Sequence, residues 1–244
     1  MDLTTRTHTA HADAWEAQAG LREPWGGAAL ALRGIRVVAC GVRHPHFNSA
    51  DVVEADCDLA GAREFYAARD LAWGVRVPAG LPWPHGRHLL TLRVMALPAP
   101  GFVPAPAVPG LTLRAAGPAD LETIVALDDA AFGETAGPAW IGPLLASERV
   151  VVALASLDGE PVATAYTLRS DGLAGPCLYL AGVGVAPAAR RLGIGAAISS
   201  WLLAQGLAAG AALAHLQADT EEAARVYRRL GFVETRGLGV YADL

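Results

Sequence analysis

The stretch VAPAARRLGIGAAI, residues 185–198, decides the fold. Pro187 ends an apolar run that is typical of a strand, and the residues after Arg191 are typical of a helix. Two arginines and two spaced glycines stand between them. A helix N-terminus exposes unpaired N–H groups and the positive end of the helix dipole, and glycine lets a ligand approach the backbone closely. The stretch therefore predicts a site for an anion such as a diphosphate.

Around this stretch the chain alternates between strand and helix patterns, which predicts an α/β fold with a mixed sheet. The expected strands of the second part are 111–116, 148–156, 161–170, 176–185, 212–218 and 237–244. The expected helices there are 118–132, 137–147, 190–209 and 220–232. In the first part we expect strands at 34–42, 71–78 and 88–97 and a helix at 58–70.

The sharpest change of composition is LPAPGFVPAPAVPG, residues 97–110, which carries five prolines. Proline removes a backbone donor and stiffens the chain, so this segment predicts an extended linker. We accordingly expect an N-terminal domain at 1–97, a Pro-rich linker at 98–110 and a C-terminal domain at 111–244.

Two common nucleotide motifs do not fit residues 185–198. A Walker loop ends in Gly-Lys-Ser/Thr, and the chain contains no lysine. A dinucleotide fingerprint needs a third glycine, but GVGVAP ends in Pro187 and GIGAAI ends in Ile198. The remaining pattern, Arg-x-x-Gly-x-Gly after Val-x-Pro, resembles the pyrophosphate-binding signature of the GCN5-related N-acetyltransferases (GNAT).

A second match supports this resemblance. The pattern Ala223-x-x-x-Tyr227-x-x-x-Gly231-Phe232 is similar to the family's other signature, one helix and one strand further on. The order of elements over 111–244 also resembles the GNAT fold, with its splayed central strands. The first part resembles, more loosely, the degenerate N-terminal half of tandem members. A faint echo between AREFYAARDLAW and ARVYRRLGF leaves duplication and chance patterning both open.

The resemblance implies acetyl-coenzyme A as cosubstrate, with its pantetheine arm between the splayed strands. Gly182 and Gly184 lie within one of these strands, where glycine is typical of a bulge or a close approach. By position, Val183 and Val185 offer backbone groups to the pantetheine and the thioester. The residues implied for the diphosphate are Arg190, Arg191, Gly193, Ile194, Gly195 and Ala196.

Tyr227 is the implied acid that protonates the departing CoA thiolate, and a core tyrosine beside Phe232 is the alternative. An amine must also lose a proton before it attacks, and residues 178–181 contain no acid for this step. Glu134, in the expected acceptor-side loop, is our candidate base. Asp128, Asp129, His215 and a water chain stay open as alternatives.

Composition excludes several other classes. The formal charge of −5 gives no indication of a nucleic-acid partner. Residues 192–214 carry no charge, but their glycines and serines favour a buried helix over a membrane span. Three scattered cysteines and the absence of an apolar leader favour the cytoplasm, and the Ala, Gly and Arg content is typical of a GC-rich bacterium.

Histidines gather in the first part without nearby acidic or cysteine partners, so we expect no metal site. The histidines concerned are His8, His11, His44, His46, His85 and His88.

The predicted function is transfer of an acetyl group from acetyl-CoA to a primary amine by direct attack. The acceptor is a small-molecule amine or a protein N-terminus, and the first part covers the acceptor side or dimerises. One alternative is a non-catalytic acyl-CoA-binding or assembly module, because the strand carboxylate is missing. Another keeps the enzyme and changes the acyl group.

Overall fold

The computed structural model describes residues 1–42, 47–133, 137–242 and 244, which form two compact units. Unit 1 combines Met1–Val94 with Glu234–Leu244, and unit 2 consists of Met95–Val233. The end of the chain thus belongs to unit 1, whereas the sequence pattern assigns residues 111–244 to one domain. The chain passes from one unit to the other twice, before and after unit 2.

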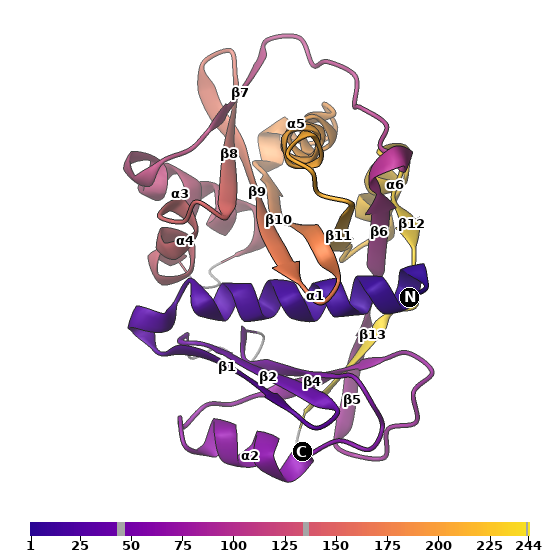
Figure 1. Cartoon of the computed structure of the whole chain (residues 1–244). Coiled ribbons are helices and arrows are strands. Elements are labelled where there is room, and N and C mark those ends of the chain that lie inside the picture. Colours follow the sequence, from indigo (N-terminus) through magenta and orange to yellow (C-terminus); the bar gives the residue numbers. More distant parts are fainter. Residues whose placement is uncertain (43–46, 134–136, 243) are drawn as a thin grey trace. The chain divides into compact units, whose positions relative to one another are not determined.

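The sheet of unit 1 has the strand order β1-β2-β3-β4-β13-β5 (Figure 1). All of its neighbouring strands are antiparallel except β3 and β4, which run parallel with helix α2 between them in sequence. The C-terminal strand β13 lies between β4 and β5 and therefore completes a sheet whose first strand, β1, begins at Gly27. The elements of unit 1 are α1 (Leu3–Gly20), η1 (Glu23–Trp25), β1 (Gly27–Leu32), β2 (Ile35–Cys40), β3 (Ser49–Val52), α2 (Leu59–Ala67), β4 (Gly74–Pro78), β5 (Arg87–Leu92) and β13 (Leu238–Ala242).

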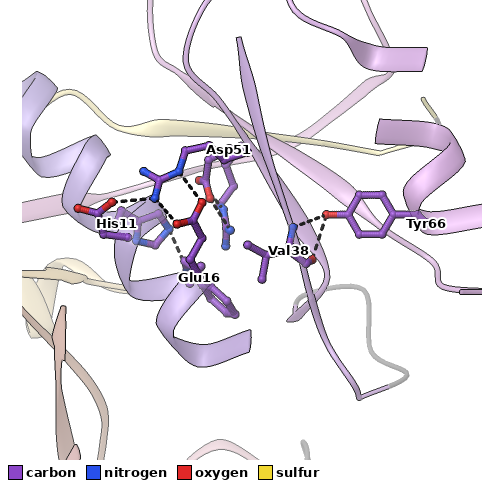
Figure 2. A network of polar contacts seen from close by, with 9 residues as sticks. His11, Glu16, Val38, Asp51 and Tyr66 are labelled. Atoms are coloured by element: carbon purple, nitrogen blue, oxygen red, sulfur yellow. Dashed lines mark hydrogen bonds and ion pairs between the residues drawn. The ribbon is translucent and has the colours of Figure 1, made fainter. Parts of the chain in front are cut away.

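Buried ion pairs connect α1 and the strands of unit 1 (Figure 2). Arg36 on β2 donates to Asp13 and Glu16 of α1, each at 2.7 Å. Arg76 on β4 donates through two nitrogens to the two carboxylate oxygens of Asp51 on β3, at 2.9 and 2.8 Å. Charges are tolerated in a protein interior when they are paired in this way, so the unit holds a polar core beside its apolar one.

The sheet of unit 2 has the strand order β12-β6-β11-β10-β9-β8-β7. Its strands and helices follow the order expected for residues 111–232, and the mixed α/β class is confirmed. The elements of unit 2 are β6 (Val94–Pro98), η3 (Ala99–Gly101), β7 (Leu111–Ala115), η4 (Pro118–Asp120), α3 (Leu121–Phe132), α4 (Gly137–Leu145), β8 (Val150–Leu157), β9 (Glu160–Gly172), β10 (Gly175–Val185), η5 (Pro187–Ala189), α5 (Ile194–Ala208), β11 (Leu213–Gln217), α6 (Glu221–Arg229) and β12 (Val233–Glu234).

The segment expected as one strand at 88–97 forms two strands. It breaks at Arg93 into β5, an edge strand of the unit 1 sheet, and β6, which lies between β12 and β11 in the unit 2 sheet. Apolar residues flank Arg93 on both sides, and a single charged residue is common within a strand, so residue pattern alone does not reveal the break.

The Pro-rich segment 98–110 packs on unit 2. Phe102, Ala105 and Val108 contact the hydrophobic core of that unit. The N–H of Val103 donates to the carbonyl of Leu230 at 3.0 Å. Proline prevents this stretch from joining the sheet, but it still covers one part of the unit 2 core.

Helices α3 and α5 lie on opposite faces of the central strands of unit 2 (Figure 1). A Cβ on Gly206 of α5 would meet the side chain of Leu178, whereas a Cβ on Gly184 would lie 2.9 Å from the Cβ of Ala131 on α3. These close approaches fix the helices against β10, the strand that leads to residues 185–198.

Candidate active site

Strands β10 and β11 run parallel and then separate. Their register pairs are Cys177↔Leu213, Leu178↔Ala214 and Tyr179↔His215. β10 continues to Val185 and β11 to Gln217, and no described strand pairs with β10 on this side beyond Tyr179. The expected splay of the central strands is therefore present, and both Val183 and Val185 lie along its open part.

A β-bulge interrupts β10 inside this open part. The register with β9 shifts between Ala181 and Gly184, so Gly182 and Val183 together stand opposite one residue of β9. Gly182 has φ of 59°, and a Cβ there would lie 3.0 Å from two carbons of the Tyr166 ring. Glycine is required at this position both by the backbone angle and by the ring above it.

The bulge also reverses which side chains of β10 face α5. Leu178 and Leu180 before the bulge belong to the core on the α5 side, and so do Val183 and Val185 after it. A regular strand would keep one parity along its length. The strand is thus turned about its own axis just where it leaves β11.

The N-terminus of α5 lies next to the open end of β10. Gly193 precedes the helix with φ of 83°, and no side chain caps it. The first helical bond runs from the N–H of Ala197 to the carbonyl of Gly193 at 3.0 Å. In the part of the chain that the structure describes, no acceptor is bonded to the N–H groups of residues 191–196. This row of donors and the helix dipole fit a bound anion.

Backbone geometry around these donors supports the same conclusion. Arg191 has φ of 66°, so it adopts the left-handed conformation close to that of Gly193. Alternation of such residues turns successive N–H groups toward one point. A Cβ on Gly195 would make only ordinary contact with Val185, at 3.6 Å. Neither crowding nor a positive φ requires a glycine there, which fits a residue kept small for a ligand.

The two arginines of this stretch differ in their contacts. The Arg190 guanidinium donates to the carbonyl of Val185 at 3.2 Å and to that of Ala131 at 3.4 Å. It therefore ties the end of β10 to the last turn of α3. Arg191 is exposed, and among the described residues no carboxylate forms an ion pair with it. Its guanidinium is the one available to a ligand.

Tyr227 lies on α6 and is only 8% exposed. Its ring packs edge-on against Phe232, with centroids 5.8 Å apart, and no hydrogen bond links its hydroxyl to another described residue. Burial raises the pKa of Tyr227 above its usual value, and the charges of Asp219 and Tyr179 raise it further. The phenol is thus a neutral donor with a free hydrogen, which suits a general acid.

Comparison with known proteins identifies the fold around this site. Residues 121–232 match the family model "Acetyltransferase (GNAT) family". The chain carries a GNAT domain. The matched segment runs from the start of α3 to Phe232 and includes the open part of β10, the N-terminus of α5 and Tyr227. The resemblance drawn from the two sequence signatures is confirmed at the level of the family, whose members use an acyl-CoA cosubstrate.

Solved structures extend the similarity beyond the GNAT domain. A GCN5-related N-acetyltransferase from Kribbella flavida is 20% identical with a TM-score of 0.75, covering 100% of this chain and 97% of its own. One from Sphaerobacter thermophilus is 18% identical with a TM-score of 0.59 over 90% and 82%. A tandem GNAT protein from the clavulanic acid biosynthesis pathway is 18% identical with a TM-score of 0.58 over 85% and 77%. These likenesses establish the fold, including an N-terminal GNAT-like half. No curated protein matches the chain in sequence.

The candidate bases are scattered around the GNAT domain. Asp128 and Asp129 lie near the end of α3, which packs against β10. His215 is fully buried on β11, with its ring stacked on that of Tyr179. Glu134 lies outside the described residues. Sequence reasoning passed over Tyr179 as an acid-free position and did not consider Tyr166. The ring of Tyr166 lies against Gly182, and Tyr179 lies where the pairing of β10 with β11 ends, so both border the candidate site.

Two findings concern metal ligands and membrane spans in the described part of the chain. Among those residues no three His, Cys, Asp or Glu side chains form a group that could hold a metal ion. His44 and His46 lie outside them. None of the described helices has both the length and the hydropathy that a membrane crossing requires.

Proposed function

We propose that the GNAT domain moves an acetyl group from acetyl-CoA to a primary amine by direct attack. The observation that carries this proposal is the opening between β10 and β11 beside the uncapped N-terminus of α5. The opening leaves strand backbone free for the amides of a pantetheine arm, and the helix terminus suits a diphosphate. One molecule that carries both groups is an acyl-CoA.

In this proposal the N–H groups of Gly193, Ile194, Gly195 and Ala196 bind the diphosphate, and Arg191 adds charge-assisted hydrogen bonds. Arg190 lines the same site while holding the end of β10 in place. Backbone groups of Val183 and Val185 bind the pantetheine and the thioester. An N–H donor there stabilises the negative charge that develops on the thioester oxygen.

The reaction then proceeds in one displacement. The amine nitrogen attacks the thioester carbonyl carbon, a C–N bond forms, and the C–S bond breaks. Tyr227 donates its hydroxyl proton to the departing sulfur, because sulfur leaves more readily as a thiol than as a thiolate. The attacking nitrogen then releases its remaining extra proton, which restores the Tyr227 hydroxyl. The amine arrives as an ammonium and first loses a proton to Asp128, Asp129, Glu134, His215 or a water.

The test is an assay of CoA release with mass detection of acetylated product, using primary amines and peptides with free N-termini. Wild type should acetylate at least one class of acceptor, and Tyr227→Phe should lower kcat about 100-fold or more. Tyr241→Phe on β13 is the matched control and should retain activity. Unchanged turnover in Tyr227→Phe would remove that residue from the mechanism.

One observation favours a second candidate function, a non-catalytic acyl-CoA-binding module. Residues 175–185 of β10 contain no carboxylate to deprotonate an amine. This candidate predicts thermal stabilisation by acetyl-CoA without acetylation of any amine, so detected product dismisses it. A third candidate keeps catalysis but uses another acyl-CoA, and relative rates with several acyl-CoAs distinguish it.

We also propose that the protein works in a bacterial cytoplasm. The cysteines Cys40, Cys57 and Cys177 are all free thiols in the structure, which agrees with a reducing compartment. Composition rich in Ala, Gly and Arg supports the bacterial source. Fractionation of a native host with an antibody to this chain would test the location.

A further inference from the structure

Two aromatic rings lie where β10 and β11 part. Tyr179 and His215 are the last register partners of the two strands, and their rings stack with centroids 5.1 Å apart and planes inclined by 18°. Tyr179 is 7% exposed and His215 is fully buried. The rings therefore lie at the closed end of the opening between the strands.

These rings lie on the face of the sheet opposite α5. Leu178 and Leu180 belong to the core on the α5 side, and side chains of a strand alternate between faces. Tyr179 thus faces the α3 side, as its neighbour Leu168 on β9 does by register. On the α5 side the same end of the opening is closed by Leu180 and Leu216. Side chains bound it on both faces.

The direction of a bound acyl-CoA follows from the proposed function, on which this inference rests. Its diphosphate lies at the N-terminus of α5, near Val185, at the open end of the gap. Its acyl group is at the far end of the pantetheine arm and so points toward the closed end. In the proposed function the thioester lies by Val183, and from Val183 back to Tyr179 the strand spans about 13 Å. Each methylene group added to the acyl chain therefore brings its end closer to these rings.

We propose that Tyr179, stacked on His215, closes the acyl pocket and restricts the cosubstrate to short acyl groups such as acetyl. A longer chain would have to displace a buried ring held between two strands, in a core that has little free volume. The hydroxyl of Tyr179 is not needed for this role, because the ring supplies the volume. Removal of the ring should open a cavity that accepts additional methylene groups.

The experiment measures binding, so it does not depend on a known acceptor. Isothermal titration of the full chain with acetyl-, butyryl- and hexanoyl-CoA gives a ratio of dissociation constants, hexanoyl to acetyl, for each variant. Wild type should prefer acetyl-CoA at least tenfold. Tyr179→Ala should lower the ratio tenfold or more, whereas Tyr179→Phe should leave it unchanged. Phe65→Ala, a similar deletion in the unit 1 core, is the control for general loosening and should also leave it unchanged.

The possible outcomes distinguish a failure of the role proposed for Tyr179 from a failure of the proposed acetyltransferase function. Equal binding of hexanoyl- and acetyl-CoA by wild type would overturn the role of Tyr179 and leave the proposed function standing. An unchanged ratio in folded Tyr179→Ala would do the same. Failure of wild type to bind any acyl-CoA would overturn both. If Tyr179→Ala does not fold, Tyr179→Leu retains apolar volume and should give a smaller shift in the same direction.

Discussion

Arg76 and Asp51 are register partners on the parallel strands β4 and β3, and their side chains form a doubly hydrogen-bonded ion pair at the last rung of that pairing. β3 ends one residue later, at Val52. In unit 2 the corresponding last rung is Tyr179↔His215, after which β10 stays paired with β9 but has no described partner on the β11 side. The same β-α-β arrangement is therefore closed in unit 1 and open in unit 2.

The start of α2 shows a matching difference. The carboxylate of Asp58 caps this helix by accepting the N–H of Gly61 at 2.9 Å. The hydroxyl of Tyr66 donates to the carbonyl of Val38 and accepts from its N–H, so both functions of that group are used (Figure 2). In unit 1 the carboxylate of Asp58 thus accepts a hydrogen bond at the start of α2, whereas in unit 2 the N–H groups at the start of α5 have no side-chain cap.

We predict that one acetyl-CoA binds per chain, because among the described residues only those of unit 2 combine an open strand pair with an uncapped helix. Isothermal titration should give a stoichiometry near one. Arg191→Glu should remove this single binding event, since it replaces a cation by an anion at the diphosphate. Binding that survives this variant, or a stoichiometry near two, would show that unit 1 binds as well.

The two arginines should separate affinity from stability. Arg191→Gln should weaken acetyl-CoA about tenfold, since hydrogen bonds to charged groups contribute about 1.5–3 kcal/mol, and leave Tm unchanged. Arg190→Gln removes bonds to two carbonyls and should lower Tm by about 2–4 °C. Titration and differential scanning calorimetry of both variants check this pair. Equal effects of the two substitutions on affinity would contradict the assignment.

The alkaline limb of the pH profile should be flat. An acid works only while it is protonated, and burial raises the pKa of Tyr227 above the usual tyrosine value of about 10. Tyr227 therefore loses its proton only at higher pH, and kcat should stay constant as the pH is raised to about 10. Initial rates with saturating acetyl-CoA measure this. An alkaline decline centred at or below about pH 10 in wild type, absent from Tyr227→Phe, would show that the pKa of the phenol is not raised.

Gly182 should tolerate no side chain. Gly182→Ala places a Cβ at φ of 59° and against the Tyr166 ring, so the free energy of unfolding should fall by about 1–3 kcal/mol. Gly142 on α4 is the matched control, because a Cβ there meets no atom within 4 Å. Gly142→Ala should be neutral or stabilise by up to about 1 kcal/mol. Urea unfolding of the full chain compares them, and similar midpoints would argue against strain at the bulge.

Local patterns predicted most of unit 2 and part of unit 1, where they missed α1, η1, β1 and β3. Periodicity and the Asp-Gly turn at 158–159 located β8, β9, β10 and α5 to within a few residues. Helix α1 was not predicted from the sequence, because its buried face includes polar side chains and so lacks the apolar stripe of an ordinary helix. The buried polar residues of α1 are Thr7, His11, Asp13 and Gln18.

Contacts between distant segments could not be predicted from the sequence. The choice of β13 for the unit 1 sheet depends on edges offered by β4 and β5, which no local pattern encodes. The two signatures located the N-terminus of α5 and Tyr227, because their chemistry depends on short spacing. Tyr166 joined the site only through cross-strand register, which depends on the bulge at Gly182.

The position of β13 also bears on how the protein is made. Synthesis proceeds from the N-terminus, so β4 and β5 leave the ribosome long before the strand that separates them in the finished sheet. Until Leu238–Ala242 emerge, the nascent chain carries two unpaired strand edges that other chains can join. A premature stop codon that removes only this last strand should therefore yield an aggregating product rather than a shortened enzyme. A chaperone that covers exposed strand edges would have to stay bound to unit 1 until synthesis is complete.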